Sequence, residues 1–248
     1  MSGAAAAMRS TCVAVERLYG PAELHLPGLD IGRSYCGTND AFRYGGDVVD
    51  AFHYGAGYTS LAVIDVTGHG VAAAPNARLV KHALRAYASR GFNARDCVRA
   101  LNRLCSENGA LEGDGSHATL FFAIVDPDRR AMHYVSAGHD AAFLIARKRA
   151  LCLEPTGPIL ALTDDDAAFD HRRVRLEAGD ILAAVTDGFS EARNASRAFL
   201  GGEALVDVIA RNRLLDPVRQ ADAVTRRAYD YSNGRLHDDV AALVVKVL

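Results

Sequence analysis

The stretch from Tyr58 to Gly70 constrains this chain more than any other part of its sequence. Leu61 to Ile64 form a short apolar run, typical of a buried strand, which ends on Asp65 and is followed by two glycines, Gly68 and Gly70. A carboxylate at the end of a buried strand, beside glycines that let a ligand approach the backbone, suits a hard cation or a phosphate group. The same carboxylate also suits a helix cap, so this stretch alone leaves two interpretations open.

Composition narrows the class of protein. The chain has 248 residues, 50% of them hydrophobic, which is enough for one large core. Lys and Arg total 28 against 30 Asp and Glu, so no basic excess indicates a nucleic-acid or membrane partner. The five cysteines form no C-x-x-C pair, and no apolar run is long enough to span a bilayer. We therefore expect a cytoplasmic protein with a flexible N-terminus over residues 1–10 and a single domain over residues 11–248.

Hydrophobic periodicity predicts the order of the secondary structure. The predicted strands are Ile31–Thr38, Val48–Tyr54, Leu61–Ile64, His117–Val125, Ala131–Ala137, Ala141–Ala146, Val174–Leu176, Ile181–Thr186 and Val240–Val247. The predicted helices are Val71–Ser89, a segment between Asn93 and Asn108, Ala204–Arg211 and Pro217–Tyr231. Strands and helices are grouped rather than alternating, which favours antiparallel sheets with helices outside them. Short links predict that the strands from His117 to Ala146 form a meander.

Aspartates lie at the end of an apolar strand in four places: Asp47, Asp65, Asp187 and the pair Asp238-Asp239. If neighbouring strands bring these ends together, like charges converge and cannot all stay ionised without a cation between them. Oxygen ligands without a nearby cysteine or histidine favour Mg²⁺ or Mn²⁺ over zinc. Two such ions about 4 Å apart can share a water, lower its pKa and direct it at a phosphorus atom. The alternative for each single aspartate is a strand-end turn.

The sequence resembles the PPM-type metal-dependent serine/threonine protein phosphatases, and within them the bacterial SpoIIE-like branch. The matching segments occur in the order of that family and extend from about Ile31 to the C-terminus. They are Gly45–Asp50, Ile64–Gly70, Ala118–Phe121, Tyr134–His139, Thr186–Asn194 and Asp238–Val240. The resemblance implies an α+β fold, a β-sandwich of two antiparallel sheets flanked by helices in αββα layers, with two Mn²⁺ or Mg²⁺ ions at one edge.

The resemblance also implies roles for individual residues. Asp65 would bridge both metals and the Val66 carbonyl would bind one of them. Asp187 and Asp238 would bind the other metal, and Asp47 would hold a metal directly or through water. Asp65 and Asp187 would thus act in catalysis through the water that the metals bind. Residues assigned to an outer or uncertain role are Asp50, Gly68, His69, Gly188 and Asp239.

The sequence does not assign a role to every candidate residue. His69 is a candidate general acid because imidazole titrates near neutral pH, but a histidine between two glycines equally suits a turn. Asp140 stands where the SpoIIE-like branch commonly has asparagine, which leaves substrate recognition open. No G-x-S-x-G motif is present, so a serine nucleophile is disfavoured.

We therefore expect a phosphatase that removes phosphate from phosphoserine or phosphothreonine on a bacterial regulatory protein. By resemblance it would be a stand-alone sigma-regulator phosphatase of the RsbX kind, acting on a STAS-domain protein of a partner-switching or stressosome system. The alternative is a non-catalytic regulator that uses the same fold to bind a partner. A binding scaffold would not need all four aspartates, so their presence favours the enzyme.

Overall fold

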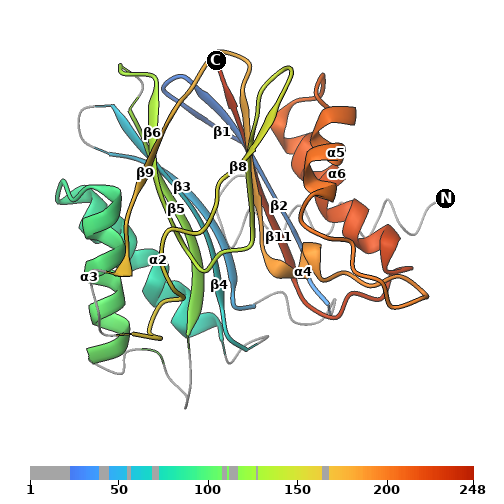
Figure 1. Cartoon of the computed structure of the whole chain (residues 1–248), viewed down its shortest axis with the longest axis horizontal. Coiled ribbons are helices and arrows are strands. Elements are labelled where there is room, and N and C mark those ends of the chain that lie inside the picture. Colours follow the sequence, from blue (N-terminus) through green and yellow to red (C-terminus); the bar gives the residue numbers. More distant parts are fainter. Residues whose placement is uncertain are drawn as a thin grey trace.

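The computed structural model consists of two antiparallel sheets packed face to face, with helices on both outer faces (Figure 1). It describes residues 23–38, 45–54, 57–68, 73–107, 111, 117–126, 128–163 and 168–248. The flexible segment expected over residues 1–10 and His69 lie outside these residues. The predicted αββα sandwich is confirmed. No helix in the described part of the chain is long and apolar enough to cross a lipid bilayer.

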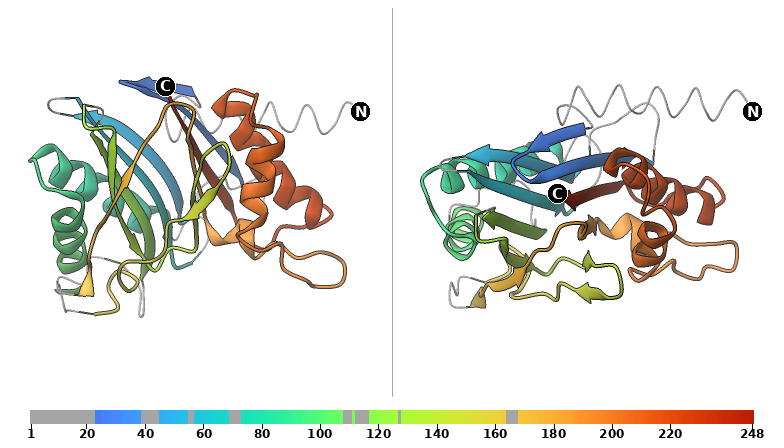
Figure 2. Two further views of the ribbon diagram at one scale, coloured as in Figure 1. Left: turned by 45° about the horizontal axis from the view of Figure 1, so that its top comes forward. Right: turned by 90° about the horizontal axis from the view of Figure 1, so that it is seen from above.

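The first sheet has six strands in the order β1-β2-β11-β10-β7-β8. They are β1 (Glu23–Leu26), β2 (Leu29–Cys36), β11 (Val240–Val247), β10 (Ile181–Val185), β7 (Ala141–Ile145) and β8 (Ala150–Cys152). The second sheet has five strands in the order β3-β4-β5-β6-β9. They are β3 (Asp47–Tyr54), β4 (Tyr58–Val66), β5 (Ala118–Asp126), β6 (Ala131–Ala137) and β9 (Arg172–Arg175). Figure 2 shows the two sheets from two further directions.

Strand β4 explains why the apolar run before Asp65 is continuous. Leu61 and Val63 face the core between the two sheets, whereas Ala62 and Ile64 face the helices on the outside. Because successive side chains of a strand point to opposite faces, a strand buried on both faces must be apolar at every position. The central position of β4 in its sheet therefore fixes the end of the strand, and with it the place of Asp65.

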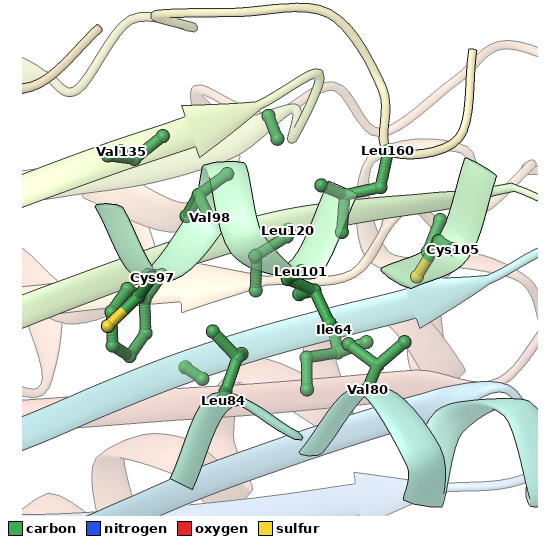
Figure 3. Close-up of a cluster of buried hydrophobic side chains, with 14 of the residues drawn as sticks. Ile64, Val80, Leu84, Cys97, Val98, Leu101, Cys105, Leu120, Val135 and Leu160 are labelled. Atoms are coloured by element: carbon green, nitrogen blue, oxygen red, sulfur yellow. The ribbon is translucent and has the colours of Figure 1, made fainter. Parts of the chain in front are cut away.

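Two helices, α2 (Ala74–Ser89) and α3 (Ala94–Glu107), cover the outer face of the second sheet (Figure 3). Val80 and Leu84 of α2 and Leu101 of α3 meet Ile64 of the sheet in one buried cluster. Pro75 falls in the first turn of α2, where its missing N–H is tolerated.

The outer face of the first sheet is covered by α5 (Ala204–Arg211) and α6 (Pro217–Tyr231). Asp216 caps α6 by accepting a hydrogen bond from the Arg219 amide at 2.9 Å, and Pro217 follows it at the first helical position. A single helical turn, α4 (Asp187–Ser190), follows β10 directly.

The meander predicted from His117 to Ala146 is wrong at its last step. β5 and β6 pair as expected, but β7 pairs with β10 and β8 in the other sheet. The link between β6 and β7 passes through Gly138, whose positive φ of 63° and close approach to Ile159 exclude most side chains. A short link therefore crosses between the two sheets instead of closing a hairpin.

The packing of α2 yields a test of this description. Leu84 is 1% exposed, so Leu84→Ala should leave a cavity and lower the free energy of unfolding by about 2–5 kcal/mol. His82→Ala, at an exposed position two residues earlier, is the control and should shift it by less than ~0.5 kcal/mol. Urea denaturation measures both variants. Equal effects of the two changes would contradict the packing described.

Candidate functional site

Two aspartates of the second sheet face each other where β3 begins and β4 ends. Asp47 lies directly opposite Asp65 in the antiparallel register, so the two side chains occupy the same face. Asp47 is 4% exposed, and burial together with the charge of Asp65 raises its pKa well above the ordinary value. Burial, followed by the charges of Asp187 and Asp238, raises the pKa of Asp65 to about 7.

The two carboxyl groups lie close enough to affect each other's pKa. The hydrogen bond from Asp47 lowers the pKa of Asp65, against the larger effect of burial. Two ionised carboxylates repel each other and cannot donate to each other, so this arrangement favours either a bound proton or a cation.

The first sheet brings two further aspartates to the same place. Asp187 begins α4 directly after β10, and Asp238 lies two residues before β11. β10 and β11 are neighbours, and the Ala241 amide donates a hydrogen bond to the Thr186 hydroxyl at 2.9 Å, which holds the two strand ends together. Burial, then the charges of Asp238 and Glu191, raise the pKa of Asp187 to about 6. The four strand-end aspartates thus come together from both sheets.

Glycines let the backbone segments approach closely around these carboxylates. A Cβ on Gly46 would lie 2.3 Å from the Val66 carbonyl oxygen, and one on Gly188 would lie 2.0 Å from the Asp239 carbonyl oxygen. Gly68 has a φ of 101°, a conformation that other residues rarely adopt. Gly46, Gly68 and Gly188 therefore keep the Val66 and Asp239 segments near the four aspartates.

Asp50 lies outside the four-aspartate group, and Asp239 lies beside it, where its charge adds to the effect of burial in raising the pKa of Asp47. Asp239 accepts hydrogen bonds from the Tyr35 hydroxyl at 2.6 Å and the Thr38 amide at 2.8 Å, so its carboxylate fastens the end of β2. Asp50 is an even number of strand positions from Val48 and faces α2, where Arg85 binds both its oxygens at 2.6 and 2.7 Å. Asp50 therefore pairs with Arg85 of α2 and not with the four strand-end aspartates.

Three residues near Asp187 were not assigned to the site from sequence. Asp140 accepts a hydrogen bond from the Ser190 hydroxyl at 2.7 Å, and the charges of Asp140 and Glu191 both raise the pKa of Asp187. Asp140 was visible as a departure from the family pattern, and Glu191 lies inside a matching motif. Neither position carried the strand-end signal that identified the four aspartates.

His139 is buried beside the site. It is 2% exposed, and burial lowers its pKa to about 4, so its ring is neutral at physiological pH. Its Nδ1 lies 3.1 Å from the Thr119 hydroxyl, and Thr119 faces Asp65 across the β4–β5 pair. A neutral buried imidazole in this position supports the structure around Asp65.

The donor atoms around the four aspartates are carboxylate oxygens and a backbone carbonyl, the kind that Mg²⁺ and Mn²⁺ prefer. Within the described residues, however, no three Asp, Glu, His or Cys side chains are already arranged to hold a metal ion. The chemistry of the donor set and the raised pKa values of Asp47 and Asp65 fit a cation.

Comparisons with known proteins agree with this architecture. Residues 55–248 match the family described as Stage II sporulation protein E (SpoIIE). The phosphoserine phosphatase RsbU of Bacillus subtilis is 27% identical over 196 residues, which cover 75% of this chain and 55% of RsbU. The matched region covers 32% of Protein IcfG of Synechocystis sp., at 26% identity, so the chain spans about half or less of the length of these two relatives.

Two solved structures share the fold. The RsbU and RsbW domains of Rv1364c from Mycobacterium tuberculosis superpose with a TM-score of 0.76 at 27% identity, over 90% of this chain and 60% of that one. The catalytic domain of the serine/threonine protein phosphatase PstP, in complex with two manganese ions, gives a TM-score of 0.65 at 17% identity, over 89% and 98%. The family match covers well over half of the sequence, and the chain belongs to the SpoIIE family.

Proposed function

We propose that this chain is a metal-dependent phosphatase that hydrolyses phosphoserine or phosphothreonine on a bacterial regulatory protein. The observation that carries the proposal is the meeting of Asp47, Asp65, Asp187 and Asp238 from the two sheets, where burial and mutual charge raise the pKa values of the first three. Such repulsion costs stability unless a cation offsets it. The family match and the similarity to RsbU support the reaction.

Each residue has a defined role in the proposed centre. Asp65 would bridge two Mn²⁺ or Mg²⁺ ions, Asp47 and the Val66 carbonyl would complete one site, and Asp187 with Asp238 would complete the other. When bound, the ions would neutralise the phosphate and activate a water for in-line attack. PstP, which has the same fold, is solved with two manganese ions.

The chain's own residues prepare the site in three ways. Asp47 and Asp65 lie opposite each other in the register of β3 and β4, so a cation between them would offset their mutual repulsion. Asp239, held by Tyr35 and Thr38, keeps the segment that carries Asp238 in place. Asp238 is exposed and Asp187 is partly exposed, which leaves one side of the centre open to a protein substrate.

The substrate class rests on similarity rather than on a bound ligand. RsbU is a phosphoserine phosphatase, and the Rv1364c structure contains an RsbU and an RsbW domain in one chain. We propose a phosphorylated STAS-type regulator of sigma-factor control as the partner, in the cytoplasm. The alternative of a non-catalytic binding module is weaker because the mutual repulsion of these aspartates would serve no purpose there.

Hydrolysis of p-nitrophenyl phosphate tests the reaction directly. The parent chain should release phosphate with Mn²⁺ and not with EDTA, and Asp187→Asn should lower kcat/KM at least ~100-fold because one ion loses a ligand. Asp207→Asn, at an exposed position of α5, is the matched control and should retain the parent rate. An inactive parent with every divalent ion, or full activity of Asp187→Asn, would contradict the proposal.

Thermal unfolding at two pH values tests the charge repulsion. The pKa values of Asp65 and Asp187 in the folded protein lie above 3.8, the ordinary value of an aspartate in an unfolded chain. Their contribution to the stability of the fold is therefore fully present below pH 3.8. It is lost as the pH rises through about 6 for Asp187 and about 7 for Asp65. In EDTA the Tm should therefore fall between pH 5 and pH 8, and Asp187→Asn should unfold at a higher temperature than the parent at pH 8.

Saturating Mn²⁺ should reverse this effect. At about 100 times its Kd, one bound ion is worth roughly 2.7 kcal/mol, or a rise in Tm of roughly 5–10 °C for a chain of this size. The rise should be smaller for Asp187→Asn than for Asp207→Asn. A Tm that does not respond to Mn²⁺ would count against a shared site.

A further inference from the structure

A hairpin extends directly from the helical turn that carries Asp187. The Gly201 amide donates to the Ser190 carbonyl at 2.8 Å, the Leu200 amide to the Ala192 carbonyl at 2.9 Å, and Arg193 pairs with Phe199 in an antiparallel bridge. Residues 190–201 are called the Arg193 hairpin below. In Figure 2 (left) this orange segment extends from α4 away from the two sheets.

The side chain of Asn194 holds the end of the Arg193 hairpin in one shape. Its Oδ1 accepts hydrogen bonds from the Ser196 amide at 3.0 Å, the Ser196 hydroxyl at 2.7 Å and the Ala198 amide at 3.0 Å. Its Nδ2 donates to the Tyr231 hydroxyl of α6 at 3.1 Å, and that hydroxyl donates to the Phe199 carbonyl at 3.2 Å. The hairpin is thus built around one side chain and fastened to α6.

The Arg193 hairpin exposes arginine and aromatic side chains next to the four strand-end aspartates. Arg193 is exposed and its guanidinium lies 4.5 Å from the centroid of the Phe199 ring, which is itself 53% exposed. Arg197 is exposed on the same hairpin, and the guanidinium of Arg227 lies 5.0 Å from the Tyr231 ring. Stacking restricts an arginine and leaves its N–H groups available to a carboxylate partner.

The charges on the two sides of α4 are opposite. Asp140, and Glu191 at the base of the hairpin, add to the four strand-end aspartates, so the centre repels an acidic chain, whereas the exposed Arg193 and Arg197 attract one. Arginine and aromatic side chains of this kind are typical of the residues that dominate binding at protein interfaces. Since the hairpin starts at Ser190, three residues after Asp187, a segment bound to it would place its neighbouring residues near the centre.

We propose that the Arg193 hairpin is the docking element for acidic residues that flank the phosphorylated side chain of the substrate. This inference rests on the proposed phosphatase function and adds the sequence preference of its substrate. Arg193 binds carboxylates of the substrate, Phe199 supports the guanidinium and contacts apolar atoms, and Asn194 keeps the hairpin in the geometry that presents both.

Two synthetic phosphoserine peptides of equal length test the proposal, one with aspartates and one with asparagines around the phosphoserine. The quantity measured is the ratio of kcat/KM for the acidic peptide to that for the neutral peptide. For the parent chain we expect a ratio above one, and for Arg193→Ala a ratio roughly five- to tenfold lower, mostly through KM. Arg193→Glu should favour the neutral peptide, and Arg193→Lys should restore part of the preference.

The control is Arg147→Glu, which changes another exposed arginine, in the β7–β8 turn at the end of β7 away from Asp140. It should keep the parent ratio. A parent ratio of one, a ratio unaffected by Arg193→Glu, or an equal loss with both peptides would overturn the docking role.

If the parent hydrolyses neither peptide, the proposed function fails, and fluorescence anisotropy of the same labelled peptides with Mn²⁺ then decides the docking role alone. Tighter binding of the acidic peptide, lost in Arg193→Glu, would support it, and equal binding would overturn it.

Discussion

The repulsion among four carboxylates, of which Asp47 is buried, at the junction of two sheets is the constraint on which the rest of this structure depends. Asp47 and Asp65 come from one sheet, and Asp187 and Asp238 from the other, so the site exists only when the sandwich is closed. The apolar faces between and outside the sheets offset the cost of bringing these charges together. The fold stabilises an arrangement that is unfavourable without a cation, which is how a protein core serves a metal centre.

Much of the fold follows from local sequence. The helical spacing of α5 and α6 predicted helices with the bounds that the structure has, and the apolar run Leu61–Ile64 predicted the centre of β4, which extends from Tyr58 to Val66. The pairing of β7 did not follow, because a short link was taken to mean a hairpin, whereas Gly138 turns the chain into the other sheet. The short edge strands β1 and β8 were missed because partners, not an apolar pattern of their own, define them.

The members of the site could be predicted from sequence where an aspartate lies at the end of an apolar strand. Asp47, Asp65, Asp187 and Asp238 share that signal, and the structure places them together. Asp50 and Asp239 lie in the same sequence motifs as these aspartates but have other partners. Asp50 binds Arg85 of α2, and Asp239 accepts a hydrogen bond from Tyr35 of β2. Such partners lie tens to hundreds of positions away in the chain, so only the folded structure separates an ion-pair carboxylate from a member of the central group.

The central claim is that the four aspartates form a cation site whose protons are displaced on binding. Calorimetric titration of Mn²⁺ into the chain at pH 7, repeated in buffers of different ionisation enthalpy, measures both stoichiometry and proton release. We expect two ions per chain and net release of protons, since the pKa of Asp65 lies at about 7 and that of Asp47 is raised. Asp65→Asn should weaken the binding of both ions. Absence of binding, or binding that Asp65→Asn does not change, would contradict the account.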